Sequence, residues 1–306
     1  MPSEPPIDIS VVMGSFNQAG ALARVLAGYA AQDATCSFEV IIVDSFSTDT
    51  TAKMMAAYTT QRHPLRFIQR DNPAGKGEAR NEGVRLAKGS IIIISDADMI
   101  PDPRFVQAHF DAHRASTEPT CFEGKAYNLQ TYVWPISDTK GLATQIPAKY
   151  KPNAALNWYY FLTGNISFPK SLFDAEGGFC LDFKQYGWED LELGYRLKKR
   201  GVPLRYLTTA INFHYHIISN NDRIKRKYAM GQSARIFIEH HPELRWFLGM
   251  HPLAIFVRRR LSKRHFLYRK MADWSQIKSH PLRNLGQWFL GEYNYVSGLL
   301  NLPITD

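Results

Sequence analysis

Two aspartates separated by one residue directly follow a very apolar stretch of the chain. Asp96 and Asp98 come after the segment SIIIIS, and Ala97 stands between them. In an extended segment residues i and i+2 point the same way, so both carboxylates could address one ligand while Ala97 packs inward. Close carboxylates repel unless a cation lies between them. Since oxygen ligands suit Mg²⁺ or Mn²⁺, the pattern predicts a metal that holds a diphosphate; the alternative is a capped loop.

A second acidic pair, Glu189 and Asp190, lies in the segment YGWEDLELGYRLKKRG. Leu193 and Leu197 follow at helical spacing, which predicts that the pair begins a helix. The positive end of the helix dipole would stabilise both charges there. Trp188 offers a flat apolar face for a sugar ring, although it could equally be a core aromatic and the acids mere caps.

Two histidines alternate with aromatic residues in the segment INFHYH, residues 211–216. In a strand, Phe213 and Tyr215 would face one side while His214 and His216 face the other. Two histidines on one face could supply an imidazole to a metal. This interpretation requires the strand to end near Asp98.

The elements that must position these residues alternate between strands and helices over the first hundred residues. Four buried strands are expected, at residues 7–13, 38–44, 65–69 and 91–94. Between them lie helical patterns, the second opening at the N-cap residues 47–49 and the third closing at a C-cap Gly89. This order predicts the α/β class, with a mostly parallel central sheet flanked by helices.

The carboxyl ends of parallel strands meet at one edge of a sheet, where ligands bind in such folds. Ser15, Phe16 and Asn17 follow the first expected strand, Asp44 ends the second, and the pair Asp96 and Asp98 follows the fourth. These polar side chains are therefore expected to converge on one site.

The composition excludes several classes of protein. The N-terminus has no basic and apolar leader pattern, and the longest apolar runs are too short to span a membrane. Three widely spaced cysteines fit neither a disulfide framework nor a zinc site. A cytoplasmic location is therefore expected.

Most of the net charge of +9 lies at the end of the chain. Residues 245–306 hold ten Lys and Arg against three Asp and Glu, and residues 256–270 interleave cations with Phe, Leu and Tyr. Residues 219–306 are predicted to form a basic, aromatic helical extension. Its segment 245–270 could contact an anionic membrane at the inner face of the cell membrane, or be a solvated helix face. Nucleic acid is not an expected partner, because the body of the chain is nearly neutral.

With these residues assembled, the chain resembles a family 2 glycosyltransferase with a GT-A fold. The matching segments come in the family's order and cover about residues 7–218: SVVMGSFN, VDSFSTDTT, GKGEARNEGVRLAKG, SDADMIPDP, TGNISFPKSLFDAEGGFCLDF and YGWEDLELGYRLKKRG. The later half is most similar to chondroitin-polymerase and polypeptide N-acetylgalactosaminyltransferase domains. The resemblance implies a catalytic domain at 1–218, with a nucleotide-binding half up to about residue 100 and an acceptor half at 101–218.

The resemblance also implies roles for individual residues. Phe16 and Asp44 would hold the base of a nucleotide sugar, and UDP is the expected nucleotide. The other implied donor-binding residues are Ser15, Asn17, Lys76, Arg80, Asp96 and Ala97. The family's VDDGS pattern has Ser45 and Phe46 in place of its second Asp and its Gly.

In the implied reaction, Asp98 and His214 bind Mn²⁺ or Mg²⁺, with His216 as the alternative imidazole. Asp190 is the general base, helped by Glu189, and Trp188 and Asn165 bind the acceptor, a glycan or lipid-linked sugar. Transfer by single displacement would invert the anomeric carbon.

Two other functions remain open from the sequence. A sugar-phosphate nucleotidyltransferase could use the same sheet, acids and metal, although the Gly-rich phosphate loop usual in that class is missing from MGSFNQAGALAR. The second alternative is a non-catalytic protein with the same fold that binds a membrane or nucleic acid.

Overall fold

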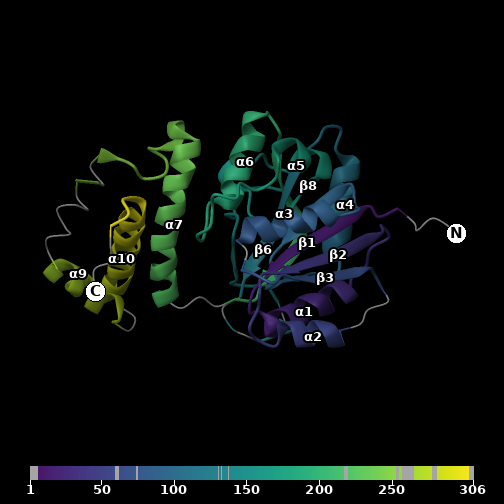
Figure 1. Ribbon diagram of the computed structural model, residues 1–306, viewed down its shortest axis with the longest axis horizontal. Coiled ribbons are helices and arrows are strands. Elements are labelled where there is room, and N and C mark those ends of the chain that lie inside the picture. Colours follow the sequence, from purple (N-terminus) through teal and green to yellow (C-terminus); the bar gives the residue numbers. More distant parts are fainter. Residues whose placement is uncertain are drawn as a thin grey trace. The chain divides into compact units, whose positions relative to one another are not determined.

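The structure is a computed structural model of the 306-residue chain (Figure 1). It describes residues 6–58, 62–73, 75–129, 131, 133–136, 138–216, 220–252, 255–256, 265–277 and 281–302. The chain divides into two compact units: an α/β unit, Met1–Leu181 with Asp190–Ile217, and a helical unit, Asp182–Glu189 with Ile218–Asp306. The predicted division after residue 218 differs from this one by the segment Asp182–Glu189 and by residue 218 itself.

The elements of the α/β unit alternate as the sequence predicts. In chain order they are β1 (Ile9–Ser15), α1 (Ala19–Ala30), β2 (Phe38–Asp44), α2 (Thr51–Ala57), β3 (Leu65–Gln69), α3 (Lys76–Leu86), β4 (Ile91–Ser95), β5 (Met99–Pro101), α4 (Phe105–Ala115), β6 (Cys121–Asn128), β7 (Ala143–Thr144), the 3₁₀ turn η1 (Trp158–Tyr160), β8 (Asn165–Pro169), α5 (Lys170–Glu176), α6 (Glu189–Lys199) and β9 (Leu204–His214).

One nine-stranded sheet forms the centre of the α/β unit. Its order is β3-β2-β1-β4-β8-β6-β9-β5, with β7 paired to β6. The strands β3, β2, β1 and β4 are parallel, and we call them the parallel half. The strands β8, β6, β9 and β5, here called the mixed half, include antiparallel pairs, and β8 runs antiparallel to β4. The α/β class is confirmed, but only half of the sheet is parallel.

Two apolar layers cover the sheet, because successive residues of a strand point to opposite faces. On one face Val11 and Val40 pack with buried residues of α1 and α4. On the other face Val12 and Ile41 pack with buried residues of α3, α5 and α6. All four residues predicted to form the buried face of α1 are buried: Leu22, Val25, Leu26 and Tyr29. Helices therefore lie on both faces, as predicted (Figure 1).

Two predicted helix ends were wrong. Helix α2 begins at Thr51, two residues after the predicted cap region, and Asp49 Oδ1 accepts the Thr51 N–H at 2.9 Å. Helix α3 ends at Leu86 with Ala87 as its C-cap, before the predicted C-cap Gly89. Gly89 is instead pressed against β1, because a Cβ on it would lie 2.5 Å from the Ser10 nitrogen.

The helical unit contains α7 (Asn220–His240), the 3₁₀ turn η2 (Pro242–Leu244), α9 (His265–Ser275) and α10 (Pro281–Leu299). Helices α7 and α10 pack side by side at two glycines (Figure 1): a Cβ on Gly231 would lie 2.0 Å from the Tyr295 oxygen, and one on Gly298 2.0 Å from the Tyr228 oxygen. Among the described helices, none combines the length and apolar character needed to cross a bilayer. Much of the predicted membrane-contact segment, residues 253–254 and 257–264, lies outside the described residues.

Candidate active site

The ends of β1 and β2 are joined by a buried hydrogen-bond cluster. Ser15 Oγ donates to Asp44 Oδ1 at 2.7 Å. The same carboxylate accepts the Ser47 hydroxyl at 2.6 Å and the Ser47 N–H at 2.9 Å. Asp44 is fully buried. Asp44 therefore shapes the loop that follows β2, and its direct contact with the base stays a prediction.

The loops after β1 and β2 are tied to each other through Asn17. Its N–H donates to Ser47 Oγ at 2.8 Å, and its Oδ1 accepts the N–H groups of Thr48 at 2.8 Å and Asp49 at 3.2 Å. Asn17 adopts a left-handed backbone with φ +50°, which asparagine tolerates. Phe16 beside it is 54% exposed. The predicted donor residues Phe16 and Asn17 therefore lie on the surface of these linked loops.

Asp96 follows β4 and is paired with a cation inside the α/β unit. Arg80 Nη2 donates to Asp96 Oδ1 at 2.7 Å. Burial favours the neutral acid, but Lys76 and Arg80 outweigh it and hold the Asp96 pKa below its usual range. Arg80 is only 1% exposed and pairs with Asp96, and its contact with the donor phosphates stays a prediction. Lys76 is exposed at the start of α3, and its contact with the phosphates stays a prediction as well.

The DAD segment turns rather than running extended. The Met99 N–H donates to the Asp96 carbonyl at 3.0 Å, which closes a turn over residues 96–99. The two carboxylates consequently meet different partners. Ala97 is fully buried in the apolar layer, as predicted, and its side chain offers nothing to a donor.

Asp98 faces three side-chain nitrogen atoms from two other segments of the chain. Its Oδ2 accepts from Gln18 Nε2 at 3.1 Å, and lies 3.6 Å from His214 Nε2 and 3.8 Å from His216 Nδ1. The two imidazole rings stack at 5.9 Å between centroids. The sequence condition for a metal site, that the strand of the histidines ends near Asp98, is met.

Strand register explains how residues so far apart meet. In the β5–β9 pair Met99 lies opposite His214, and in the β6–β9 pair Asn128 lies opposite His214. The Tyr215 N–H donates to the Asp98 carbonyl at 2.7 Å, which extends the pairing by one step. Phe213 and Tyr215 are buried on the other side of the strand, as the alternating pattern predicts.

His214 is oriented from both sides of its ring. Nδ1 lies 3.3 Å from Asn128 Oδ1, and Nε2 faces Asp98. Because an amide oxygen only accepts hydrogen bonds, this contact requires a hydrogen on Nδ1, and Nε2 is the nitrogen that faces Asp98. Burial lowers the pKa of His214, but the neighbouring carboxylates of Asp98 and Asp96 outweigh it and raise the pKa above its usual value.

The donor set fits a divalent cation. Asp98 Oδ2 and His214 Nε2 lie 3.6 Å apart, within the span of two ligand atoms that each lie about 2.1 Å from one ion. One buried carboxylate and one or two imidazoles leave coordination positions for diphosphate oxygens and water. Asp98 and His214 are thus able to hold Mn²⁺ or Mg²⁺.

The second acidic pair stands where the chain passes between the two units. Helix α6 begins at Glu189, as predicted, and Asp190 Oδ1 accepts the Leu191 N–H at 2.8 Å. Within the α/β unit, burial raises the pKa of Glu123 well above its usual value, and the charge of Asp190 raises it further. The predicted meeting of Asp190 and Asp98 at one cavity stays a prediction.

Trp188 packs within the helical unit. Its indole N–H donates to the Met230 carbonyl at 3.0 Å, and its ring meets Phe237 edge to face at 5.9 Å. Its backbone is left-handed, with φ +75°. The indole is therefore fixed by its neighbours, and acceptor binding by Trp188 stays a prediction.

Asn165, predicted to bind the acceptor, is part of the interior instead. It is fully buried. Its Nδ2 donates to the Ala210 carbonyl and to Asn212 Oδ1, each at 3.0 Å, and its Oδ1 lies 3.0 Å from His109 Nε2. Its amide is already used inside the sheet, and acceptor binding by Asn165 stays a prediction.

Sequence reasoning missed three residues that contact or adjoin the candidate site. Gln18 directly follows the residues Ser15 to Asn17 of the expected donor loop, and this position could have indicated that it lies at the site. Asn128 and Glu123 lie on β6, in a segment with no motif. Only the pairing of β6 with β9 brings Asn128 to His214.

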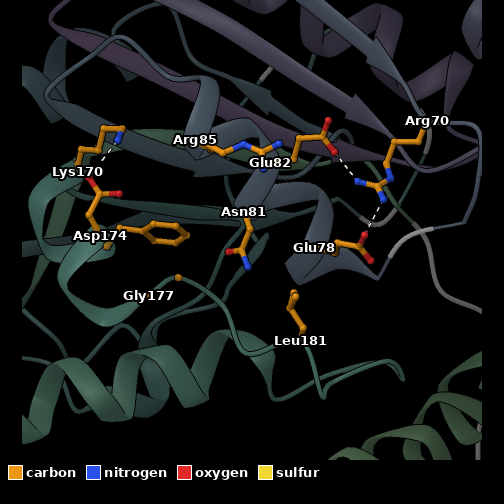
Figure 2. Close-up of a pocket in the computed structure, with 11 residues that line it drawn as sticks. Arg70, Glu78, Asn81, Glu82, Arg85, Lys170, Asp174, Gly177 and Leu181 are labelled. Atoms are coloured by element: carbon orange, nitrogen blue, oxygen red, sulfur yellow. Dashed lines mark hydrogen bonds and ion pairs between the residues drawn. The ribbon is translucent and has the colours of Figure 1, made fainter.

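A separate cavity of about 540 Å³ lies between α3, α5 and the loop 177–181. Figure 2 shows that its charged groups pair with each other: Arg70 with Glu78 and Glu82, and Lys170 with Asp174. Neither Asp98 nor Asp190 lines it. This cavity is therefore not the predicted site.

Comparisons with known proteins point to one family. The family model described as glycosyl transferase family 2 matches residues 10–183, more than half of the chain. Validoxylamine A glucosyltransferase of Streptomyces hygroscopicus subsp. jinggangensis is 28% identical over 222 residues, covering 64% of this chain and 52% of that protein. Chondroitin synthase of Escherichia coli is 26% identical over 236 residues, covering 67% of this chain and 34% of that protein. The chain thus spans about half the length of the first of these curated relatives, and less of the second.

Solved structures with a similar fold include two complexes with nucleotide sugars. The mannosyltransferase PcManGT from Pyrobaculum calidifontis, in complex with GDP-Man and Mn²⁺, matches 98% of this chain and 89% of its own, with a TM-score of 0.59 and 18% identity. S. aureus TarS 1–349 in complex with UDP-GlcNAc matches 96% of this chain and 91% of its own, with a TM-score of 0.55 and 16% identity. At these identities the likeness shows the fold alone.

Proposed function

The chain belongs to glycosyltransferase family 2, and on that premise we propose that it is an inverting, metal-dependent enzyme that moves a sugar from a nucleotide diphosphate sugar to an acceptor hydroxyl. The observation that carries this proposal is the approach of His214 and His216 to Asp98 at the carboxyl edge of β4. That approach joins the motif after β4 to a strand more than a hundred residues later.

Asp98 and His214 are the proposed metal ligands. His214 is preferred over His216 because Asn128 turns its Nε2 toward Asp98. When bound, the ion would neutralise the charge that develops on the departing nucleoside diphosphate. Mn²⁺ and Mg²⁺ both fit a site with oxygen and imidazole ligands and open positions.

The donor nucleotide is proposed to lie across the linked loops after β1 and β2. Phe16 and Asn17 are exposed there, while the buried cluster of Ser15, Asp44 and Ser47 fixes the loop shape. Exposed Lys76 lies at the phosphate side, and Asp96, held by Arg80, faces the ribose or a water molecule. A UDP sugar is the proposed donor; complexes of similar folds contain UDP-GlcNAc or GDP-Man.

Asp190 is the proposed general base. Its carboxylate takes the proton of the acceptor hydroxyl while that oxygen forms a bond to the anomeric carbon. The bond from that carbon to the diphosphate breaks on the opposite side, and the nucleoside diphosphate leaves. One displacement inverts the configuration. Glu189 and Trp188 are proposed to orient the acceptor, a glycan or lipid-linked sugar, and segment 245–270 to contact an anionic membrane.

The decisive experiment is a panel of nucleotide sugars tested for metal-dependent hydrolysis and transfer, with Asp190→Asn as the informative variant. Removing a general base costs about 10²- to 10⁴-fold in rate, so we expect turnover to fall by that factor while nucleotide affinity is unchanged. Calorimetry with UDP and Mn²⁺ supplies the affinity, and Asp182→Asn, an exposed acid nearby in sequence, is the matched control.

Two results would contradict the proposal. Activity above a few per cent in Asp190→Asn would remove Asp190 from its role as the base. Release of pyrophosphate instead of a nucleoside diphosphate by the unaltered protein would mean nucleotidyl transfer and not glycosyl transfer.

A further inference from the structure

Phe46 has a backbone conformation that its side chain disfavours. Its φ is +65°, in the left-handed region where the Cβ crowds the following carbonyl oxygen. Among the described non-glycine residues with positive φ, three are asparagines, which tolerate this region, and the other two are the aromatic residues Phe46 and Trp188. In the VDDGS pattern that the chain resembles, this position is glycine, which would adopt the conformation without cost.

The surrounding hydrogen bonds fix the loop on both sides of Phe46. The Ser45 N–H donates to the Ser15 carbonyl at 2.8 Å, and the Ser47 N–H donates to Asp44 Oδ2 at 2.9 Å. Asn17 then holds the residues that follow. The backbone of residue 46 is therefore set by the loop, whichever side chain stands there.

Core packing does not explain the choice of phenylalanine. The Phe46 ring is 44% exposed, and Phe16 on the linked loop is 54% exposed. Neither ring takes part in an aromatic contact with another described residue. Residues held in disfavoured backbone regions concentrate at ligand-binding sites, and two exposed rings on linked loops at the carboxyl edge of the sheet lie where a ligand binds in this fold class.

We propose that Phe46 is a donor-binding residue whose ring stacks on the nucleobase of the donor, on the same surface as Phe16. This inference rests on the proposed function, because it requires a nucleotide donor. An exposed aromatic face suits a flat nucleobase, and such stacking does not depend on which base is present. Since Asp44 is buried and Ser45 replaces the second aspartate of the pattern, stacking replaces part of the polar base recognition.

The test is Phe46→Gly, measured for both stability and nucleotide affinity. Glycine relieves the left-handed strain, so we expect the melting temperature to stay level or rise. Loss of the ring should weaken UDP binding about tenfold. The weakening should be the same with Mn²⁺ and without it, because the ring contacts the base. Phe46→Tyr keeps the ring and should retain the affinity.

The control is Asn153→Gly, which changes another left-handed residue of the α/β unit, with φ +60°, and should leave UDP affinity unchanged. Unchanged UDP affinity in a folded Phe46→Gly protein would overturn the inference alone. Equal loss in Phe46→Tyr and Phe46→Gly would also overturn it. If the unaltered protein binds neither UDP nor GDP, the proposed function fails first and the inference falls with it.

Discussion

The parallel half of the sheet and its mixed half bury different kinds of side chain. The centres of β1, β2 and β4 bury valine and isoleucine on both faces. The mixed half buries the polar residues Asn165 and Ser167 of β8 and Asn212 of β9. Apolar packing therefore dominates one half, while hydrogen bonds between side chains organise much of the other.

The polar network of the mixed half runs from β9 through β8 to α4. Asn165 contacts Asn212 and His109, and Ser167 Oγ lies 2.8 Å from both His109 Nδ1 and His113 Nε2. Gly124 leaves the space that the Asn165 amide fills, because a Cβ there would lie 2.0 Å from Asn165 Oδ1. The mixed half thus depends on buried polar groups that hydrogen-bond to one another. Removal of one partner leaves the others unsatisfied and destabilises the fold.

The largest effect on stability is expected from Asn165→Ala, in the mixed half. The change leaves His109 Nε2, Asn212 Oδ1 and the Ala210 carbonyl without the amide in a buried setting, so we expect a loss of about 3 kcal/mol in the free energy of unfolding. The matched change in the parallel half is Ile93→Val, which should cost about 1 kcal/mol. Chemical denaturation of both variants measures the difference, and equal losses would remove the contrast.

Acid should weaken the mixed half. Burial lowers the pKa of His109 to about 3 and that of His113 to about 4. Unfolded histidine has its usual pKa near 6.5, so the unfolded state takes up protons first as the pH falls. The two histidines make their full contribution to stability above pH 6.5, and this contribution is lost as the pH falls toward their pKa values in the folded state. His109 alone should lower the free energy of unfolding by about 2 kcal/mol between pH 6.5 and 5.

Hydrogen exchange can locate this loss, because global melting also includes His63, whose pKa burial lowers to about 4 near β3. Amides of α4 and β8 should lose protection between pH 6.5 and 5 before those of β1 and β2. Replacement of His109 by glutamine, which does not titrate, should flatten the pH dependence of the free energy of unfolding. A parallel loss of protection in all four elements would count against the assignment.

The smallest expected effect tests the contact that links the mixed half to the metal ligands. Asn128→Ala removes the acceptor that holds Nδ1–H of His214, and outer-shell changes of this kind cost at least about tenfold in metal affinity. Asn128→Asp keeps an acceptor and should retain the affinity. Calorimetry with Mn²⁺ measures the metal affinity without any need for turnover. If His214 is the ligand, His216→Ala should lower that affinity less than His214→Ala.

Local patterns were enough for the parallel half. Strands β2 and β3 have the predicted bounds, because continuous apolar runs between turn residues specify buried strands. The predicted strand before Asp96 is likewise present as β4. The prediction that residues 96–98 are extended was wrong, because a backbone hydrogen bond closes a turn there. The residue types alone do not reveal this hydrogen bond.

The amino-acid sequence by itself determined the α/β class, the family motifs and the candidate acids and histidines, since these depend on residue type and short spacing. Only the tertiary structure decided which of them meet. Register across β5, β9 and β6 brought Asp98, His214 and Asn128 together, and folding buried Asp44, Arg80 and Asn165 among partners inside the α/β unit. The reason is physical: strand pairing and burial join residues far apart in the chain, and no short pattern records those partners.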